Sequence, residues 1–288
     1  MEVRRTKYRS RILAQIPGRW YGGDHAAPSQ LSAITENCGS IGPEPCLNFA
    51  PGQKYANNMV FETTSNKTPI FNDIENCNLA AVSWVIPDMH WSDHPATPPQ
   101  GNDGTGPIYV ATLVDAIGLS PCTDPDNGLP YWNNTAILIT WDDWGGWYDH
   151  VPPFHLGGEG INLWGKKYTY GFRVPLLVVS PYTKAGYVSG AISGTPSYPP
   201  PPQYTHDFGS ILALIEYNFL GSNEIGQISP SYPFADNWAP DWNNPLGNIP
   251  LQDFFQFPYR DFTVVPTPPG YDANYFESYP GDPEGGDD

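Results

Sequence analysis

The chain has 288 residues, and its 34 prolines, 29 glycines and 14% aromatic residues are typical of a loop-rich globular protein rather than a helical bundle. Its formal net charge of −17 argues against a nucleic acid as partner, because phosphate backbones bind cationic surfaces. No run of eighteen or more apolar residues occurs, so we expect no membrane-spanning helix.

The amino-terminal part is polar and turn-rich, and we expect residues 1–69 to form irregular structure. It opens with a basic segment that lacks the apolar core of a signal peptide. The four cysteines, Cys38, Cys46, Cys77 and Cys122, show no CxxC spacing, which argues against a zinc site. Two disulfides would suit an exported protein, with Cys38 and Cys46 as the easiest local pair. Three pairings and a reduced set all stay open.

Regular secondary structure is predicted at five places in the rest of the chain. A strand is expected at 79–86, closed by a proline, and apolar spacing predicts a helix at 109–118. Aliphatic strands are expected at 136–140 and 174–180. Both lack alternation, which is typical of strands buried on both faces of a parallel sheet. The apolar run at 208–220 predicts a second helix.

Two adjacent carboxylates, Asp142 and Asp143, directly follow the strand at 136–140. Ligands of open α/β sheets bind beyond the carboxyl ends of the strands, and Gly145 and Gly146 allow a turn that brings both carboxylates to one ion. Asp-Asp before Gly-Gly is also ordinary turn chemistry. Three flanking tryptophans and the Tyr-Asp-His step that follows favour a cation site. The metal stays open among magnesium, calcium, manganese and iron.

Four blocks of sequence carry a family resemblance. They are WVIPDMHWSDHP at 84–95, TWDDWGGWYDHVPP at 140–153, GFRVPLLVVSPYTKAGYV at 171–188 and THDFGSILALIEYNFLG at 205–221. Together they resemble the bacterial phosphoesterase family that includes phosphocholine-preferring phospholipases C and a metal-dependent acid phosphatase. The resemblance implies an α/β fold, a three-layer α/β/α sandwich of alkaline-phosphatase-like type, over residues 70–263. It also implies a secreted or periplasmic protein, because the family is exported.

The resemblance implies that Asp142 and Asp143 bind the catalytic divalent metal ion and that His94 contacts the phosphoryl group. The family also carries an amino-terminal Glu-Asn-Arg-Ser-Phe-Asp-type motif, and Glu36-Asn37 lacks that continuation. We therefore expect the carboxy-terminal part of a larger phosphoesterase, with a sandwich incomplete at its amino-terminal side. Two functions follow: hydrolysis of phosphate esters by metal-assisted phosphoryl transfer, or a catalytically inactive remnant that binds a partner. The nucleophile is not identified.

His94 and His206 are the candidate catalytic residues. His94 lies in a Ser-Asp-His-Pro step, where it contacts phosphate or is held in its loop by Asp93. His206 precedes the helix at 208–220, whose N-cap we expect to be Asp207. There it either frames an anionic ligand or helps to cap a packed helix.

Three further features have weaker functional claims. His150 is expected to be satisfied within its own turn, with support of a metal ligand as the alternative. Arg173 either anchors the strand that it precedes or clamps phosphate. Residues 264–288 are rich in Pro, Gly, Tyr and acid, and we expect them to be disordered because little there can be buried.

Overall fold

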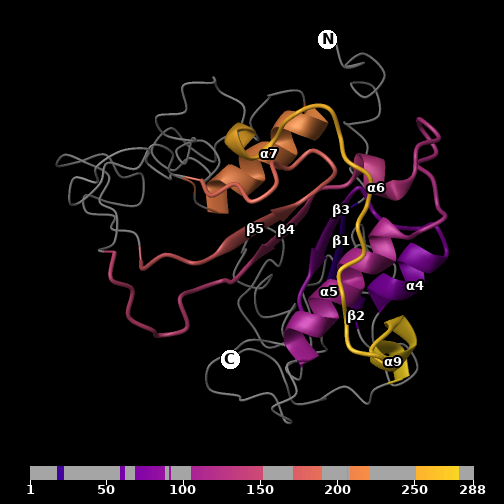
Figure 1. The fold of residues 1–288 in the computed structure, drawn as a ribbon, viewed down its shortest axis with the longest axis horizontal. Coiled ribbons are helices and arrows are strands. Elements are labelled where there is room, and N and C mark those ends of the chain that lie inside the picture. The colour runs from indigo at the N-terminus through magenta and orange to yellow at the C-terminus, as the bar shows by residue number, and fades with distance from the viewer. Residues whose placement is uncertain are drawn as a thin grey trace, which may run out of the picture. The chain divides into compact units, whose positions relative to one another are not determined.

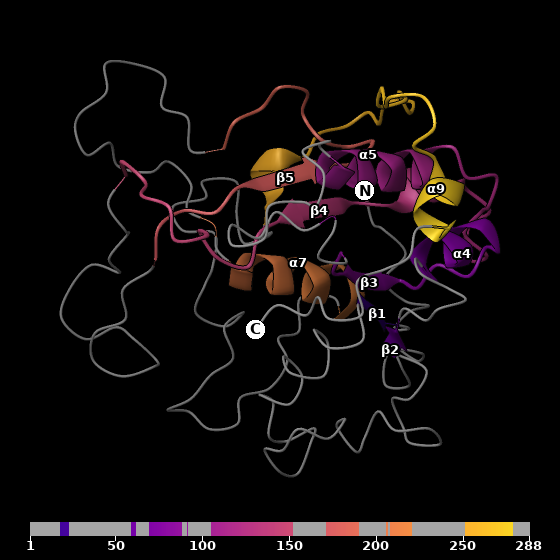
Figure 2. The ribbon, with the colours of Figure 1, turned by 90° about the horizontal axis from the view of Figure 1, so that it is seen from below.

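The protein has a mixed α/β fold in the computed structural model (Figures 1 and 2). The structure describes residues 18–22, 59–61, 69–87, 91, 105–151, 171–189, 206, 208–220 and 251–278. The elements are β1 (Gly18–Gly22), β2 (Met59–Phe61), α4 (Pro69–Glu75), β3 (Val82–Val85), α5 (Thr105–Gly118), α6 (Tyr131–Asn134), β4 (Ile137–Thr140), β5 (Leu176–Val179), α7 (Phe208–Leu220), η3 (Gln252–Phe254) and α9 (Ala273–Ser278).

The described residues divide into two compact units. One unit takes its described residues from 136–260, and the other takes them from 16–135 and 261–288. The boundary between residues 135 and 136 falls inside the segment 70–263 that the sequence predicts as one domain.

A three-stranded sheet in the order β2-β1-β3 belongs to the second of these units. Both pairings are parallel, and Trp20 of β1 lies opposite Met59 of β2 and Trp84 of β3. Two of these strands fall within residues 1–69, which the sequence predicts to be irregular. Strands of three to five residues are too short to show a hydrophobic period, so the composition of the surrounding turns dominated that prediction.

Aromatic rings fill the core between α4, α5 and α9, which lie side by side in Figures 1 and 2. The Tyr109 ring stacks on Trp91 at a centroid distance of 5.1 Å, and Phe276 meets both rings edge-on. Phe71 of α4 stacks on Phe276 at 6.2 Å. All four side chains are buried, so three helices far apart in the sequence are joined by one cluster.

The carboxy-terminal segment is ordered through Ser278, which corrects the expectation of disorder for its first part. Phe276 of α9 is completely buried. The Thr112 hydroxyl donates a hydrogen bond to the Tyr271 carbonyl at 3.2 Å, and the Val265 N–H donates one to the Asp115 carboxylate at 2.8 Å. A segment of acidic and turn-forming composition is therefore held by one aromatic anchor and by polar bonds to α5. The remaining residues, 279–288, lie outside the described part.

A disulfide joins Cys77 to Cys122 across 45 residues. It links the end of α4 to the segment after α5, and both helices contribute to the aromatic core. This bond is one of the three pairings that the sequence left open, the one in which Cys38 and Cys46 are the remaining two cysteines. Those two lie outside the described residues.

The other unit contains β4 and β5, which pair antiparallel with Leu138 opposite Val178. The predicted strands are confirmed in position, but the predicted parallel pairing is wrong. One face of the β4–β5 pair packs on α7 and η3, around the buried side chains Ile211, Leu214, Leu251 and Phe254. On the other face Leu177 is 52% exposed, so β5 is not buried on both faces.

The predicted helices are confirmed in kind. The helix expected at 109–118 is α5, which begins four residues earlier, with Pro107 in its first turn, where the missing N–H costs nothing. The helix expected at 208–220 is α7, with the same bounds. Its predicted N-cap, Asp207, lies outside the described residues. None of the helices that the structure describes is long and apolar enough to cross a membrane.

Candidate functional site

The two predicted metal ligands lie at the carboxyl end of β4, where the chain turns. The Asp143 N–H donates to Asp142 Oδ1 at 3.0 Å, and the Gly145 N–H donates to Asp143 Oδ1 at 2.5 Å. Gly145 and Gly146 both have positive φ, 66° and 75°, which glycine adopts without a steric cost. The predicted turn chemistry and the predicted strand-end position are thus found together.

Both carboxylates are exposed, and their donor atoms suit a hard divalent cation. Each carboxylate oxygen can accept more than one contact, so the turn bonds of Asp142 and Asp143 leave capacity for an ion. Within the part of the chain that the structure describes, no group of three or more His, Cys, Asp or Glu side chains is placed to hold one metal. The pair therefore fits a metal as part of a ligand set that water or other residues would complete.

An ion pair braces the loop that carries these carboxylates. Arg173 Nε donates to Asp149 Oδ2 at 2.6 Å and Arg173 Nη2 to Asp149 Oδ1 at 2.9 Å, a bidentate contact across 24 residues. The Arg173 hydrogen bonds hold the pKa of Asp149 well below its usual range, and the same bonds raise the pKa of Arg173. Arg173 thus ties the segment before β5 to the loop after β4, as the anchoring alternative predicts.

His150 is exposed and has a local partner. Its side chain is 84% accessible, and Nδ1 lies 3.5 Å from Asp149 Oδ1. This is the within-turn contact that the sequence favours, and it places the imidazole beside the Asp149–Arg173 brace.

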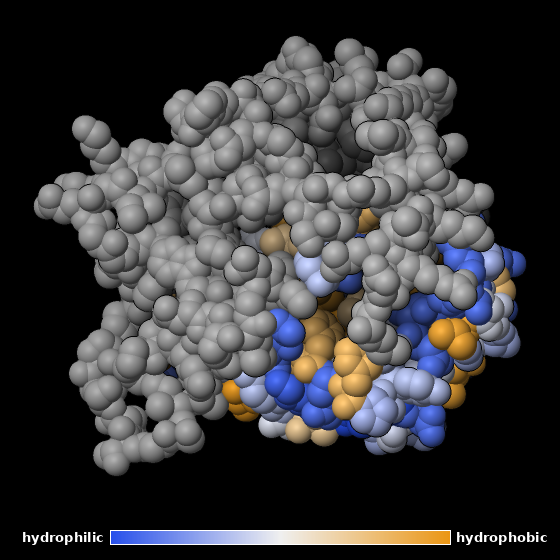
Figure 3. Space-filling view, turned by 90° about the horizontal axis from the view of Figure 1, so that it is seen from above, coloured by the Kyte–Doolittle hydropathy of each residue, from blue (hydrophilic) through white to orange (hydrophobic). Residues whose placement is uncertain are grey.

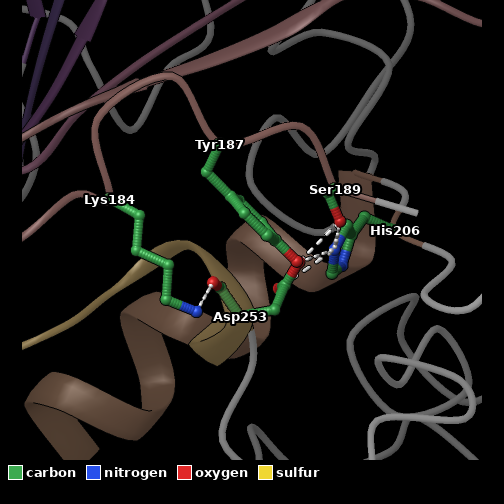
Figure 4. A network of polar contacts seen from close by, with 5 residues as sticks. All are labelled: Lys184, Tyr187, Ser189, His206 and Asp253. Atoms are coloured by element: carbon green, nitrogen blue, oxygen red, sulfur yellow. Dashed lines mark hydrogen bonds and ion pairs between the residues drawn. The ribbon is translucent and has the colours of Figure 1, made fainter. Parts of the chain in front are cut away.

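His206 belongs to a buried polar network that the sequence did not predict (Figure 4). Its Nε2 lies 2.8 Å from the Ser189 hydroxyl and 3.2 Å from Asp253 Oδ1. Asp253 is 1% exposed and accepts hydrogen bonds from Ser189 at 2.6 Å and from the Tyr187 hydroxyl at 3.0 Å. The Lys184 ammonium donates to the Asp253 backbone carbonyl at 2.5 Å.

The arrangement differs from that of a nucleophilic Ser-His-Asp triad. In a triad the carboxylate bonds one imidazole nitrogen and the serine donates to the other. Here Ser189 donates its proton to Asp253, so His206 Nε2 must be the donor to Ser189, and the carboxylate approaches that same nitrogen.

Asp253 is ionised in this network. Burial by itself raises the pKa of the Asp253 carboxyl. Hydrogen bonds from His206, Ser189 and Tyr187, together with the charge of His206, outweigh burial and bring that pKa below its usual value. The Asp253 carboxylate therefore joins three segments of the chain: the one that holds Tyr187 and Ser189, the one that holds His206, and η3.

The predicted site residues are only partly brought together. Asp142 and Asp143 are neighbours in one turn, and His206 lies in the Asp253 network. His94 lies outside the described residues, so its predicted role stays a prediction. Asp253 was missed because an acid within Leu-Gln-Asp-Phe-Phe has no motif, although the apolar residues around it signal burial.

The model of the Phosphoesterase family matches residues 46–220, more than half of the chain. The chain belongs to the Phosphoesterase family. The predicted resemblance is thereby confirmed, and the match begins ahead of the first block that carried it. The matched region includes β4, the Asp142–Asp143 turn and α7.

Relatives of this chain carry phospholipase C names. The non-hemolytic phospholipase C of Burkholderia pseudomallei (strain K96243) is 28% identical over 228 residues, covering 72% of this chain and 28% of the relative. Phospholipase C B of Mycobacterium tuberculosis (strain ATCC 25618 / H37Rv) is 32% identical over 127 residues, covering 39% and 22%. Non-specific phospholipase C4 of Arabidopsis thaliana is 31% identical over 170 residues, covering 54% and 28%.

The aligned segments span less than a third of the length of each of these relatives. No solved structure matches this chain.

Proposed function

We propose that this phosphoesterase-family chain hydrolyses phosphate esters, either phospholipids or small phosphomonoesters, by metal-assisted phosphoryl transfer. The proposed scaffold is the three-layer α/β/α sandwich of alkaline-phosphatase-like type. One observation carries the proposal: the family match over residues 46–220 contains a pair of exposed carboxylates at the carboxyl end of a strand. Adjacent carboxylate oxygens suit a hard divalent cation, and such a cation can assist phosphoryl transfer.

In this proposal Asp142 and Asp143 hold a divalent metal ion. The ion would stabilise negative charge on the phosphoryl oxygens when bound. His94 donates a hydrogen bond to a phosphoryl oxygen, and His206, whose Nε2 contacts Ser189 and Asp253, is the second proposed catalytic histidine.

The test compares wild type with Asp142→Asn and Asp143→Asn on a chromogenic phosphate monoester and a phosphocholine diester, with Mg²⁺, Ca²⁺, Mn²⁺ or Fe²⁺ supplied in turn. Asparagine keeps one acceptor oxygen for the turn bond, removes the charge and replaces the other carboxylate oxygen with an NH2 donor. We expect each variant to lose about 100-fold or more in kcat/KM, the scale on which one electrostatic group acts at a phosphoryl site.

The matched control is Asp124→Asn. Asp124 also accepts a backbone N–H in a turn, from Asp126 at 2.8 Å, and it has no part in the proposed site. Full activity in this control with loss in Asp142→Asn and Asp143→Asn would support the assignment. Retained activity in Asp142→Asn would contradict it.

The second candidate function is that of a non-catalytic phosphoesterase relative with a binding role. It is favoured by the sequence after Glu36-Asn37, which does not continue as the family's amino-terminal motif does. It predicts no turnover of any ester by wild type at any metal. Metal-dependent hydrolysis by the purified protein would remove it.

We further propose a secreted or periplasmic location. The Cys77–Cys122 disulfide supports it, because structural disulfides persist in oxidising compartments.

A further inference from the structure

Large aromatic side chains are exposed on the loop that follows the Asp142–Asp143 turn. Trp144 is 43% exposed, Trp147 72% and Tyr148 83%, and we call these three the aromatic surface. Exposed rings alone do not mark a docking surface. On the face in Figure 3, hydrophobic residues of the described part also stand in patches among hydrophilic ones. Whether these rings form a docking surface depends on how they are held and on what lies beside them.

The aromatic surface is braced from behind. The rings of Trp144 and Tyr148 both contact Phe172 edge-on, with centroid distances of 6.1 and 5.8 Å. The bidentate Asp149–Arg173 pair fixes the next residue along the loop. Rings presented by an anchored loop lose less conformational freedom on docking than rings on a loose one.

The exposure of Trp147 and its place in the loop suit direct contact with a partner. It has the second-largest exposure of the aromatic side chains in this loop, and it lies four residues after Asp143. Burying so much apolar surface in a partner is favourable at about 25 cal/mol per Å², which makes Trp147 and Tyr148 the largest available contribution in the loop.

The chemistry of the rings selects the partner. Trp and Tyr combine an apolar body with a polar edge and collect where hydrocarbon meets water. The exposed carboxylates Asp142 and Asp143 and the net charge of −17 oppose an anionic surface. We propose that Trp147 and Tyr148 dock this chain onto the surface of a zwitterionic phospholipid bilayer, beside the carboxylate turn.

This inference rests on the proposed function for its choice of a lipid partner, but the docking is measured without catalysis. The experiment sediments wild-type protein with sucrose-loaded phosphatidylcholine vesicles, with a chelator present so that hydrolysis does not accompany binding. Trp147→Ala and the double variant Trp147→Ala/Tyr148→Ala are compared with wild type. Trp147→Ala leaves both Phe172 ring contacts in place, so its effect does not depend on the brace.

The matched control is Phe257→Ala/Tyr259→Ala. It removes two rings of 79% and 53% exposure from the same unit, where they contact Tyr182. We expect Trp147→Ala to lower the partition coefficient about tenfold and the double variant to lower it further, with the control at the wild-type value. Replacing about half of the lipid with anionic phosphatidylglycerol is expected to weaken wild-type binding, because like charges repel.

Three results would overturn the docking proposal. They are equal partition of all variants, stronger binding to the anionic vesicles, or self-association of wild type that the double variant loses while vesicles bind no protein. The last would make a second copy of the chain the occupant. Hydrolysis of a water-soluble ester, assayed separately, distinguishes the two proposals: turnover without Trp147-dependent binding removes the docking, and Trp147-dependent binding without turnover removes the hydrolase function.

Discussion

Replacing Phe276 with alanine is expected to lower the free energy of unfolding of its unit by about 3–5 kcal/mol, the range for removing a large ring from a closed core. Phe276 is completely buried, and its ring contacts Phe71, Trp91 and Tyr109. These neighbours come from segments that are distant in the sequence, and a disulfide restrains two of those segments. They can therefore collapse only partly into the cavity that the ring would leave.

The measurement is urea unfolding at neutral pH, followed by hydrogen exchange of individual peptides. Exchange should accelerate in α4, α5 and α9. The control is Phe257→Ala, which removes an equal ring that is 79% exposed and should change stability by less than about 0.5 kcal/mol. A stability equal to wild type in Phe276→Ala would show that the carboxy-terminal helix does not contribute to the core.

The elements that the sequence predicts well are those whose pattern repeats. In α5 and α7 the apolar spacing covers three or more turns, β4 and β5 lie within aliphatic runs, and β3 lies within a largely apolar one. The direction in which two strands pair does not follow from such a pattern. An aliphatic run suits a strand of either orientation, and β4 meets its partner β5 only after 35 intervening residues.

The carboxy-terminal helix shows why composition can mislead. Its surroundings are Pro, Gly and acid, and its own six residues are too few for a period. The order of α9 depends on a receiving site made by Phe71, Trp91 and Tyr109, and no local property of the segment encodes that site.

In the candidate site, too, some features could be predicted from the sequence and others could not. Asp142 and Asp143 were predictable because strand, acids and glycines are consecutive. The brace between Asp149 and Arg173 and the pairing of His206 with Asp253 join residues 24 and 47 positions apart. The sequence shows which residues could form such pairs, but only the fold shows which of them are in contact.

Replacing Asp253 with alanine is expected to destabilise the unit that contains β4, β5 and α7 by about 3–5 kcal/mol, because it removes the charged acceptor of a buried network. Tyr187 and Ser189 would lose their hydrogen bonds to the carboxylate, and His206 would lose its contact with Asp253 Oδ1. Asp253→Asn keeps the size and one acceptor oxygen, so we expect it to lose less. Hydrogen exchange should accelerate near Ser189 and in α7, with α4 and α9 unchanged.

The stability that Asp253 contributes is expected to depend on pH in a definite direction. The folded pKa of Asp253 lies below its ordinary value, so the stabilisation by its carboxylate is complete above the unfolded pKa of about 3.9 and is lost as the pH falls through the folded pKa. The stability difference between wild type and Asp253→Asn should therefore be constant in this respect at higher pH and shrink below about pH 4. Urea unfolding of both proteins at neutral and at acid pH measures it. A difference that grows on acidification would mean that Asp253 is not held as a carboxylate by Ser189, Tyr187 and His206. Acidification raises the free energy of unfolding when the folded state holds a neutral carboxylic acid, and lowers it when the folded state holds a carboxylate.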